Sequence, residues 1–287
     1  MKKGFSVASE LGGDRPTLSF EFFPPKDELG VATLNQTVEE LLKVSPDFVS
    51  VTYGAMGSNQ ESSIAVVEKL SPLVPTIAHL TCIGATTAGI QKLMHRYDGA
   101  GVAGILALRG DKPQDYSEPT SNDFNYASDL VELVKDSTQF EIGVAAFPEK
   151  HPESLTLEDD IKILKMKQDS GANFAMTQLF FDVDAYSKLV EDATAAGVNI
   201  PIVPGVMPIA NVKQVFRMAQ MSGAAIPPKL ELALGEARKD EDARAIGMNF
   251  SSELVRRLLA IGAPGIHIFT LNQHRAALEL VKAAELA

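Results

Sequence analysis

The sequence predicts an α/β fold, a (β/α)8 barrel of the TIM type. Short β-rich segments alternate with longer amphipathic segments along the chain. The β-rich segments are almost continuously apolar, which is typical of parallel strands buried on both faces. Eight of them are present, and eight strand–helix units close naturally into a barrel. An open, doubly wound sheet is the main alternative for the same pattern.

The expected elements follow one another in a regular order. Glycines such as Gly171 and Gly197 mark helix ends just before a strand. The segment 223–262 is too long for one connection, so we expect extra helices before the last strand. No linker or low-complexity tract divides the chain, and we expect residues 1–287 to form a single barrel domain. The strands are expected at 17–22, 47–52, 76–81, 104–108, 140–146, 173–178, 200–204 and 265–270, with helical patterns between them.

Composition and charge argue against a nucleic-acid-binding, membrane-spanning or disulfide-bonded protein. The chain has 26 Lys and Arg against 37 Asp and Glu, and its net charge of −11 disfavours nonspecific binding to nucleic acid or anionic membranes. No apolar segment approaches the ~18 residues of a membrane span, and the N-terminus lacks a signal-peptide pattern. The single cysteine, Cys82, cannot form an intramolecular disulfide. We therefore expect a cytoplasmic protein.

One carboxylate stands out, Glu21 in the segment SFEFFPPK. An unpaired buried charge is costly, so either a cation neutralises Glu21 or its surroundings keep it protonated for use as an acid. Pairing with Arg109 is the simplest structural interpretation, and a catalytic role is the other.

Further polar side chains collect where the expected strands end. In barrels of this kind the active site lies at the C-terminal ends of the strands, so these side chains are expected to share one pocket. His79 has a structural interpretation as well, because a histidine within a strand is often an ordinary core residue. The strand ends carry Glu21, Thr52, Tyr53, His79, Arg109, Asp111, Phe147, His151, Gln178 and Gln273.

Metal and covalent chemistry find little support. The five histidines show no spacing typical of a metal site, so no metal is expected. The chain also lacks a local signature of serine or cysteine nucleophiles such as G-x-S-x-G. A bound organic cofactor is then the expected source of difficult chemistry.

Several segments, taken together and in order, resemble the methylenetetrahydrofolate reductase family over about residues 17–275. They are SFEFFPPK, FVSVTYGA, AHLTC, ALRGD, FNYASDLV, VAAFPEKHPE, GANFAMTQLFFD, PIVPGVMPI and IFTLN. The resemblance implies a (β/α)8 barrel that holds FAD. It also implies hydride transfer from NADH or NADPH through FAD to 5,10-methylenetetrahydrofolate, giving 5-methyltetrahydrofolate for methionine synthesis.

The resemblance also implies roles for individual residues. Glu21 matches the general acid that helps to open the substrate's ring, and burial is expected to raise the pKa of its carboxyl. Asp111 matches a catalytic aspartate near both flavin and folate, and Gln178, Gln214 and Gln273 fall at folate-binding positions. The implied cofactor positions, with Thr52 toward the nicotinamide, are Thr52, Tyr53, Ala55, His79, Arg109, Gly110, Asp111, Ala127, Phe147, His151, Ser154, Asp160, Ile163, Met166 and Lys167.

Some positions depart from the family pattern. Phe147 stands where tyrosine is usual, Ile163 and Met166 where some members have polar or basic side chains, and Gln273 where arginine is usual. These departures concern cofactor affinity and binding of the substrate's tail. The alternatives are a flavin-free folate-dependent barrel enzyme, acting by direct hydride or methyl transfer, and a non-catalytic folate-binding oligomer. The family also implies a homo-oligomer.

Overall fold

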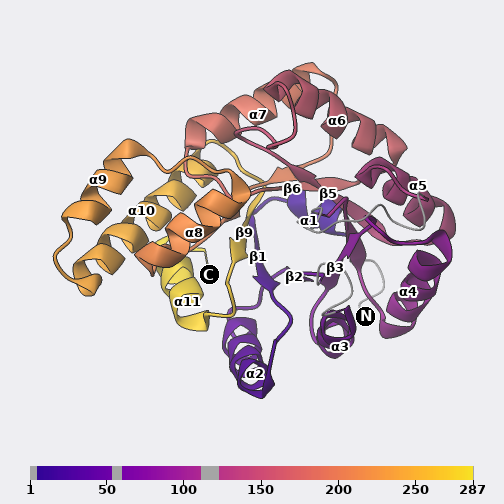
Figure 1. Ribbon diagram of the computed structural model, residues 1–287, viewed down its shortest axis with the longest axis horizontal. Helices are drawn as coiled ribbons and strands as arrows, with labels where there is room; N and C mark the ends of the chain where they lie inside the picture. Colours follow the sequence, from indigo (N-terminus) through magenta and orange to yellow (C-terminus); the bar gives the residue numbers. More distant parts are fainter. Residues whose placement is uncertain (1–4, 54–59, 111–122, 287) are drawn as a thin grey trace.

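The computed structural model describes residues 5–53, 60–110 and 123–286, and its strands form one closed parallel barrel (Figure 1). All the strand pairs are parallel, and the order of pairing is β7-β6-β5-β4-β3-β2-β1-β9-β8. The predicted barrel is therefore confirmed over the open sheet. The strands are β1 Thr17–Phe22, β2 Phe48–Val51, β3 Thr76–Thr81, β4 Gly104–Leu108, β5 Glu141–Ala146, β6 Phe174–Thr177, β7 Ile202–Val203, β8 Gly205–Val206 and β9 Gly265–Phe269.

The barrel closes through a seventh strand that Pro204 divides into β7 and β8. β7 pairs with β6 on one side, and β8 pairs with β9 on the other. Proline has no backbone N–H to give to a ladder, but its carbonyl accepts from the N–H of His267 at 3.0 Å. The strand expected at 200–204 thus continues to Val206 as two short strands, β7 and β8. Because these two occupy one strand position, the barrel has eight strand positions.

Helices surround the barrel as an outer layer (Figure 1). Side chains that accept from backbone N–H groups of the first turn fix several of their starts, for example Asp27, Thr86 and Asp182. The helices that follow the strands are α2 Glu28–Leu42, α3 Gln60–Leu70, α4 Thr87–Ala100, α5 Ala127–Ser137, α6 Leu157–Ser170, α7 Val183–Ala195, α8 Val212–Ser222 and α11 His274–Ala283.

The expected extra helices precede the last strand. They are α9 (Pro228–Glu236) and α10 (Asp240–Ala260), and Figure 1 shows them beside α8 at one flank of the barrel. Leu230 and Leu234 of α9 pack in a small apolar cluster with Ile209 and Val215. None of the helices in the described ranges is both long enough and apolar enough to cross a membrane.

A short N-terminal helix, α1 (Val7–Leu11), closes the bottom of the barrel. Val7 and Leu11 are buried against interior residues such as Phe48 and Phe174. The Glu141 carboxylate at the start of β5 accepts from the N–H of Ala8 at 3.1 Å. α1 therefore covers the N-terminal ends of the strands with apolar side chains.

Strand alternation on β1 separates apolar from polar side chains. Phe20 and Phe22 face outward and belong to the core shared with Leu34 and Val38 of α2. Glu21 faces the barrel interior, where it lies close to His79. The two phenylalanines therefore pack β1 against α2, and the opposite face of the strand points a carboxylate into the barrel interior.

Candidate active site

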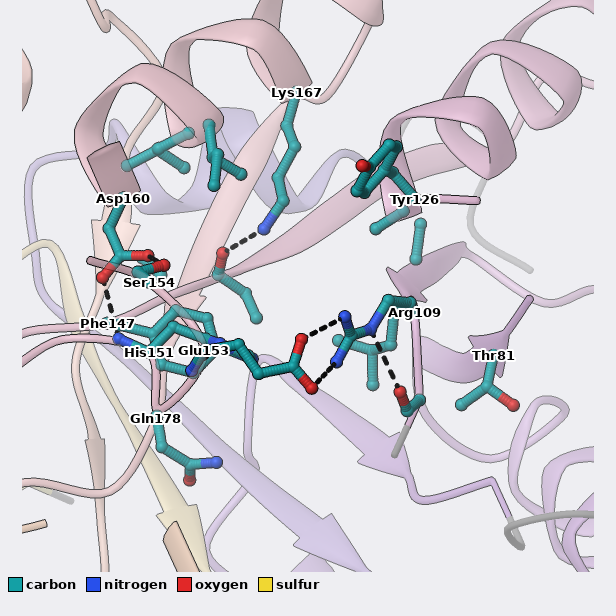
Figure 2. Close-up of a pocket in the computed structure, with 18 of the residues that line it drawn as sticks. Thr81, Arg109, Tyr126, Phe147, His151, Glu153, Ser154, Asp160, Lys167 and Gln178 are labelled. Atoms are coloured by element: carbon teal, nitrogen blue, oxygen red, sulfur yellow. Dashed lines mark hydrogen bonds and ion pairs between the residues drawn. The ribbon is translucent and has the colours of Figure 1, made fainter. Parts of the chain in front are cut away.

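A cavity of about 740 Å³ opens at the C-terminal ends of β3 to β6 (Figure 2). Its floor includes Thr81, Ala107 and Ala146 from the strand ends, and α5 and α6 contribute walls. A volume of this size lies within the range of about 300–1,000 Å³ that is usual for small-molecule sites. The cavity therefore lies at the C-terminal ends of the strands, where the sequence predicted it.

Most of the implied cofactor positions meet around this cavity. His79 does not line it and lies deeper, beside Glu21. Ala55 and Asp111 lie outside the described residues. The implied residues that line the cavity are Thr52, Tyr53, Arg109, Gly110, Ala127, Phe147, His151, Ser154, Asp160, Ile163, Met166, Lys167 and Gln178.

Lys167 is the buried cation of the cavity. It projects from α6, is 9% exposed, and donates from Nζ to the carbonyl of Ala145 at 3.0 Å (Figure 2). Burial lowers the pKa of Lys167 to about 8, and the nearby Asp160 opposes that shift. A buried ammonium is costly to keep charged, so an anionic group next to it would be stabilised.

Asp160 organises the loop that follows β5. Its carboxylate accepts from the backbone N–H of His151 at 2.8 Å and from the hydroxyl of Ser154. These contacts fix the turn at the cavity wall, with His151 packed edge-on against Phe147 at 4.7 Å between ring centroids. Asp160 thus shapes the pocket as well as lining it.

Arg109 forms an ion pair with Glu153 across the cavity (Figure 2). Both guanidinium nitrogens of the fork take part, Nη1 to Oε2 at 2.5 Å and Nη2 to Oε1 at 2.9 Å. The structural interpretation in which Glu21 pairs with Arg109 is therefore wrong.

Glu21 lies below the cavity in a buried polar cluster. Thr52, which lines the cavity, donates its hydroxyl to Glu21 Oε1 at 3.1 Å. Glu21 Oε2 lies 3.5 Å from His79 Nε2 and 3.7 Å from His267 Nε2. The Glu21 carboxyl therefore does not line the cavity itself but is separated from it by Thr52. Its neighbours are a hydroxyl and two imidazoles.

The electrostatics of Glu21 differ from the expectation. Burial raises the pKa of its carboxyl, but His79, His267 and Thr52 lower it by more, so the pKa lies below the usual value. The expected rise from burial is wrong because it left out these neighbours. Burial also lowers the pKa of His79. Glu21 opposes this shift, because a nearby carboxylate favours the protonated imidazole.

The implied folate residues lie in two places. Gln178 projects into the cavity, and its Oε1 accepts from the N–H of Leu179 at 2.8 Å (Figure 2). Gln214 on α8 and Gln273 before α11 meet at an exposed point away from the cavity lining, with Gln273 Nε2 3.4 Å from Gln214 Oε1. The fold thus brings together two glutamines that are 59 positions apart in sequence.

Sequence reasoning missed several residues of the wall. Glu153, Tyr126 and Met221 line the cavity without having been expected there. Glu153 and Tyr126 stand inside the family segments VAAFPEKHPE and FNYASDLV, which was the available signal. Met221 had none, because only the packing of α8 brings it to the rim.

The family model for methylenetetrahydrofolate reductase matches residues 7–285. The chain is 37% identical over 259 residues to the 5,10-methylenetetrahydrofolate reductase of Salmonella typhimurium, covering 89% of this chain and 86% of that one. It is 36% identical to methylenetetrahydrofolate reductase (NADH) 1 of Arabidopsis thaliana, covering 98% of this chain but 50% of the plant protein.

Among solved structures, an uncharacterized protein from Clostridium thermocellum, which binds two copies of 5-methyl-5,6,7,8-tetrahydrofolic acid, aligns with a TM-score of 0.66 at 17% identity. The alignment covers 97% of both chains, and it supports the barrel fold. Taken with the matched family model and the bacterial relative, these findings show that the chain belongs to the methylenetetrahydrofolate reductase family.

Proposed function

We propose that this protein reduces 5,10-methylenetetrahydrofolate to 5-methyltetrahydrofolate with a hydride that comes from NADH or NADPH by way of bound FAD. The main evidence for this reaction is the match to the family model over residues 7–285. The cavity at the barrel mouth, with Glu21 beneath it, supports the proposed position of the active site. The relatives from Arabidopsis thaliana and Zea mays, which are named for NADH, favour NADH as the donor.

The cavity has the chemistry that a flavin dinucleotide requires. Lys167, Arg109 and His151 would hold the diphosphate, because these two cations and an imidazole all line the same cavity. Ile163 and Met166 are apolar and partly exposed there, so this wall would contact the cofactor by packing. When bound, FAD supplies a two-electron carrier between nicotinamide and folate.

Glu21 would supply the proton of the folate step. Opening the five-membered ring of methylenetetrahydrofolate needs a proton on the departing nitrogen, and the resulting iminium carbon then accepts the hydride. Thr52 links Glu21 to the cavity and holds Oε1 at 3.1 Å. The Glu21 carboxyl would give this proton to the departing nitrogen, and a hydride that originates on the nicotinamide would complete the methyl group.

We propose that three glutamines recognise the folate substrate. Gln178 in the cavity would hydrogen-bond the pterin, and Gln214 with Gln273 would meet the more distant part of folate. Asp111 is proposed as the second catalytic carboxylate on the family resemblance alone.

The experiment that tests this function is an anaerobic absorbance titration of the purified protein. Flavin bands should bleach on addition of NADH and return on addition of methylenetetrahydrofolate, with Glu21→Gln slowing the return by about 10²- to 10⁴-fold. Protein that neither binds added FAD nor oxidises NADH with folate would refute the proposal. NADH oxidation without any flavin would instead establish direct hydride transfer.

We also propose one cytoplasmic domain, residues 1–287, that forms a homo-oligomer. The buried single thiol of Cys82 fits a reducing compartment. Exposed apolar side chains on the outer surface, Leu73, Leu232 and Ile261, offer area for contact between copies. Light scattering of the purified chain measures the number of copies.

A further inference from the structure

The chain leaves β1 through Phe23, Pro24 and Pro25, just after Glu21. On the β9 side, the parallel pairing of β1 ends at Glu21 and Phe269. Proline has no backbone N–H, so the two prolines cannot continue this ladder. The N–H and C=O of Phe23 therefore need partners from outside the sheet, because unpaired backbone groups away from water are costly.

Asn272, in the loop after β9, is the partner of both groups. Its Oδ1 accepts from the N–H of Phe23 at 3.0 Å, and its Nδ2 donates to the carbonyl of Phe23 at 2.9 Å. A side-chain amide carries the same kinds of donor and acceptor as a peptide group. Asn272 thus continues the contact between the β9 and β1 segments beyond the end of their ladder.

The loop that carries Asn272 has an unusual backbone conformation. Leu271 and Asn272 have φ values of 48° and 56°, in the left-handed region that residues other than glycine seldom adopt. The hydroxyl of Thr270 accepts from the N–H of Asn272 at 3.1 Å, and the hydroxyl of Thr37 on α2 donates to the carbonyl of Asn272 at 2.9 Å. Conformations of this kind persist only where the surroundings fix them, and they cluster at functional sites.

The same loop holds the backbone at Glu21 and two residues beyond it. Thr270 donates its hydroxyl to the carbonyl of Glu21 at 2.6 Å, and Asn272 binds both backbone groups of Phe23. We infer that Asn272 is a positioning residue for the folate step, which fixes the end of β1 and so the place of the Glu21 carboxyl beneath the cavity. The residue that follows it, Gln273, is the one that meets Gln214.

This inference rests on the proposed function, and the two half-reactions separate it from a purely structural role. Reduction of flavin by NADH needs no acid, whereas reoxidation by methylenetetrahydrofolate does. In Asn272→Ala, the folate half-reaction should slow by about 10- to 100-fold, because misplacing a reacting group by about 1 Å can cost about 10²-fold. Asn272 does not line the cavity proposed for FAD, so FAD affinity and the NADH half-reaction should stay unchanged.

Three further variants complete the experiment. Asn272→Gly accepts the left-handed backbone but removes the amide, so it should slow the folate half-reaction as Asn272→Ala does. Asn272→Asp keeps the shape and the acceptor but puts an oxygen where the donor to the Phe23 carbonyl was, and it should also be slow. The matched control is Asn173→Ala: its Oδ1 accepts from the N–H of Ile142 at 2.8 Å at the opposite end of the barrel, and both half-reactions should keep their rates.

The outcomes are distinct. If the unmodified protein is not reoxidised by methylenetetrahydrofolate, the proposed function fails and this inference fails with it. If it is reoxidised but Asn272→Gly keeps the full folate rate, the function stands and the inference is wrong. Equal slowing of both half-reactions would also overturn the inference, since it would indicate general damage to the fold. Should Asn272→Ala not fold, Asn272→Gly and Asn272→Asp decide, because both tolerate the backbone conformation of this loop.

Discussion

At the scale of single residues, Lys167 is a buried cation that lines the cavity. The ammonium is only 9% exposed, and it donates to the backbone carbonyl of Ala145. Burial lowers the pKa of Lys167 to about 8, so the charge is retained at neutral pH but is easily lost above it. An arginine would not have this sensitivity, because its guanidinium stays charged.

This arrangement predicts pH-dependent cofactor binding. As the pH rises through about 8, Lys167 loses its proton in the free protein, and the affinity for FAD should fall by roughly tenfold, the worth of one charge-assisted hydrogen bond. Burial lowers the pKa of His151 below its usual value, so that ring is already neutral in this range. Equilibrium titration with FAD, followed by flavin fluorescence at several pH values, measures the effect.

The controls for Lys167 lie on the same helix. Lys167→Met should bind FAD weakly at every pH, and Lys162→Met, which removes an exposed lysine paired with Glu158, should behave like the unmodified protein. A full pH dependence that persists in Lys167→Met would contradict the assignment.

At the scale of elements, the loop between β5 and α6 both builds the pocket and partly fills it. Asp160 of α6 fixes the loop through His151 and Ser154, and Glu153 then reaches across to Arg109. A carboxylate on this guanidinium occupies the same fork that a diphosphate would use. If the diphosphate takes this fork, as we propose, it replaces Glu153 as the anionic partner of Arg109.

Removing this competitor should tighten FAD binding. In Glu153→Gln, the affinity should rise by about two- to fivefold, because partly exposed ion pairs are worth up to about 1 kcal/mol. Glu158→Gln removes the same charge from α6 where it pairs with Lys162, away from the cavity lining, and should have a smaller effect. Weaker FAD binding in Glu153→Gln, measured by calorimetry, would mean that Glu153 supports the site instead of competing for it.

The elements also show what a sequence can and cannot predict. Short, almost continuously apolar segments predicted the strands to within a residue or two, except where Pro204 divides the seventh strand. The five-residue α1 was missed because so short a helix has too little periodicity to recognise. For the site, strand ends were the right signal for Arg109 and Gln178, since every parallel strand ends at the same mouth.

The cluster beneath the cavity was harder to predict for a definite reason. His267 reaches Glu21 only because β9 pairs with β1 across 246 positions of chain, and that closure is a property of the whole barrel. The pKa of Glu21 was misjudged for the same reason: burial can be read from SFEFFPPK, but the opposing histidines come from two other strands.

The whole molecule divides stability and chemistry between the two ends of the barrel. At the bottom, α1 seals the interior with Val7 and Leu11, against the ring of Phe48. At the top, the interior changes from apolar residues to the Glu21 cluster and then to the cavity. The separation is typical of barrels in which one face carries stability and the other carries function.

This separation predicts that damage at the bottom should cost stability and leave catalysis intact. Leu11→Ala removes a side chain that is 3% exposed, and such a truncation should lower the free energy of unfolding by about 2–3 kcal/mol. Leu73→Ala, at a position 61% exposed, is the matched control and should change it little. Urea unfolding gives the stability of each variant, and FAD affinity and both half-reaction rates are then measured on the folded protein. Unchanged values in Leu11→Ala would show that the seal acts only on stability. A loss of FAD affinity in this variant, at concentrations of urea where it is fully folded, would instead mean that packing at the bottom of the barrel positions the residues at its top.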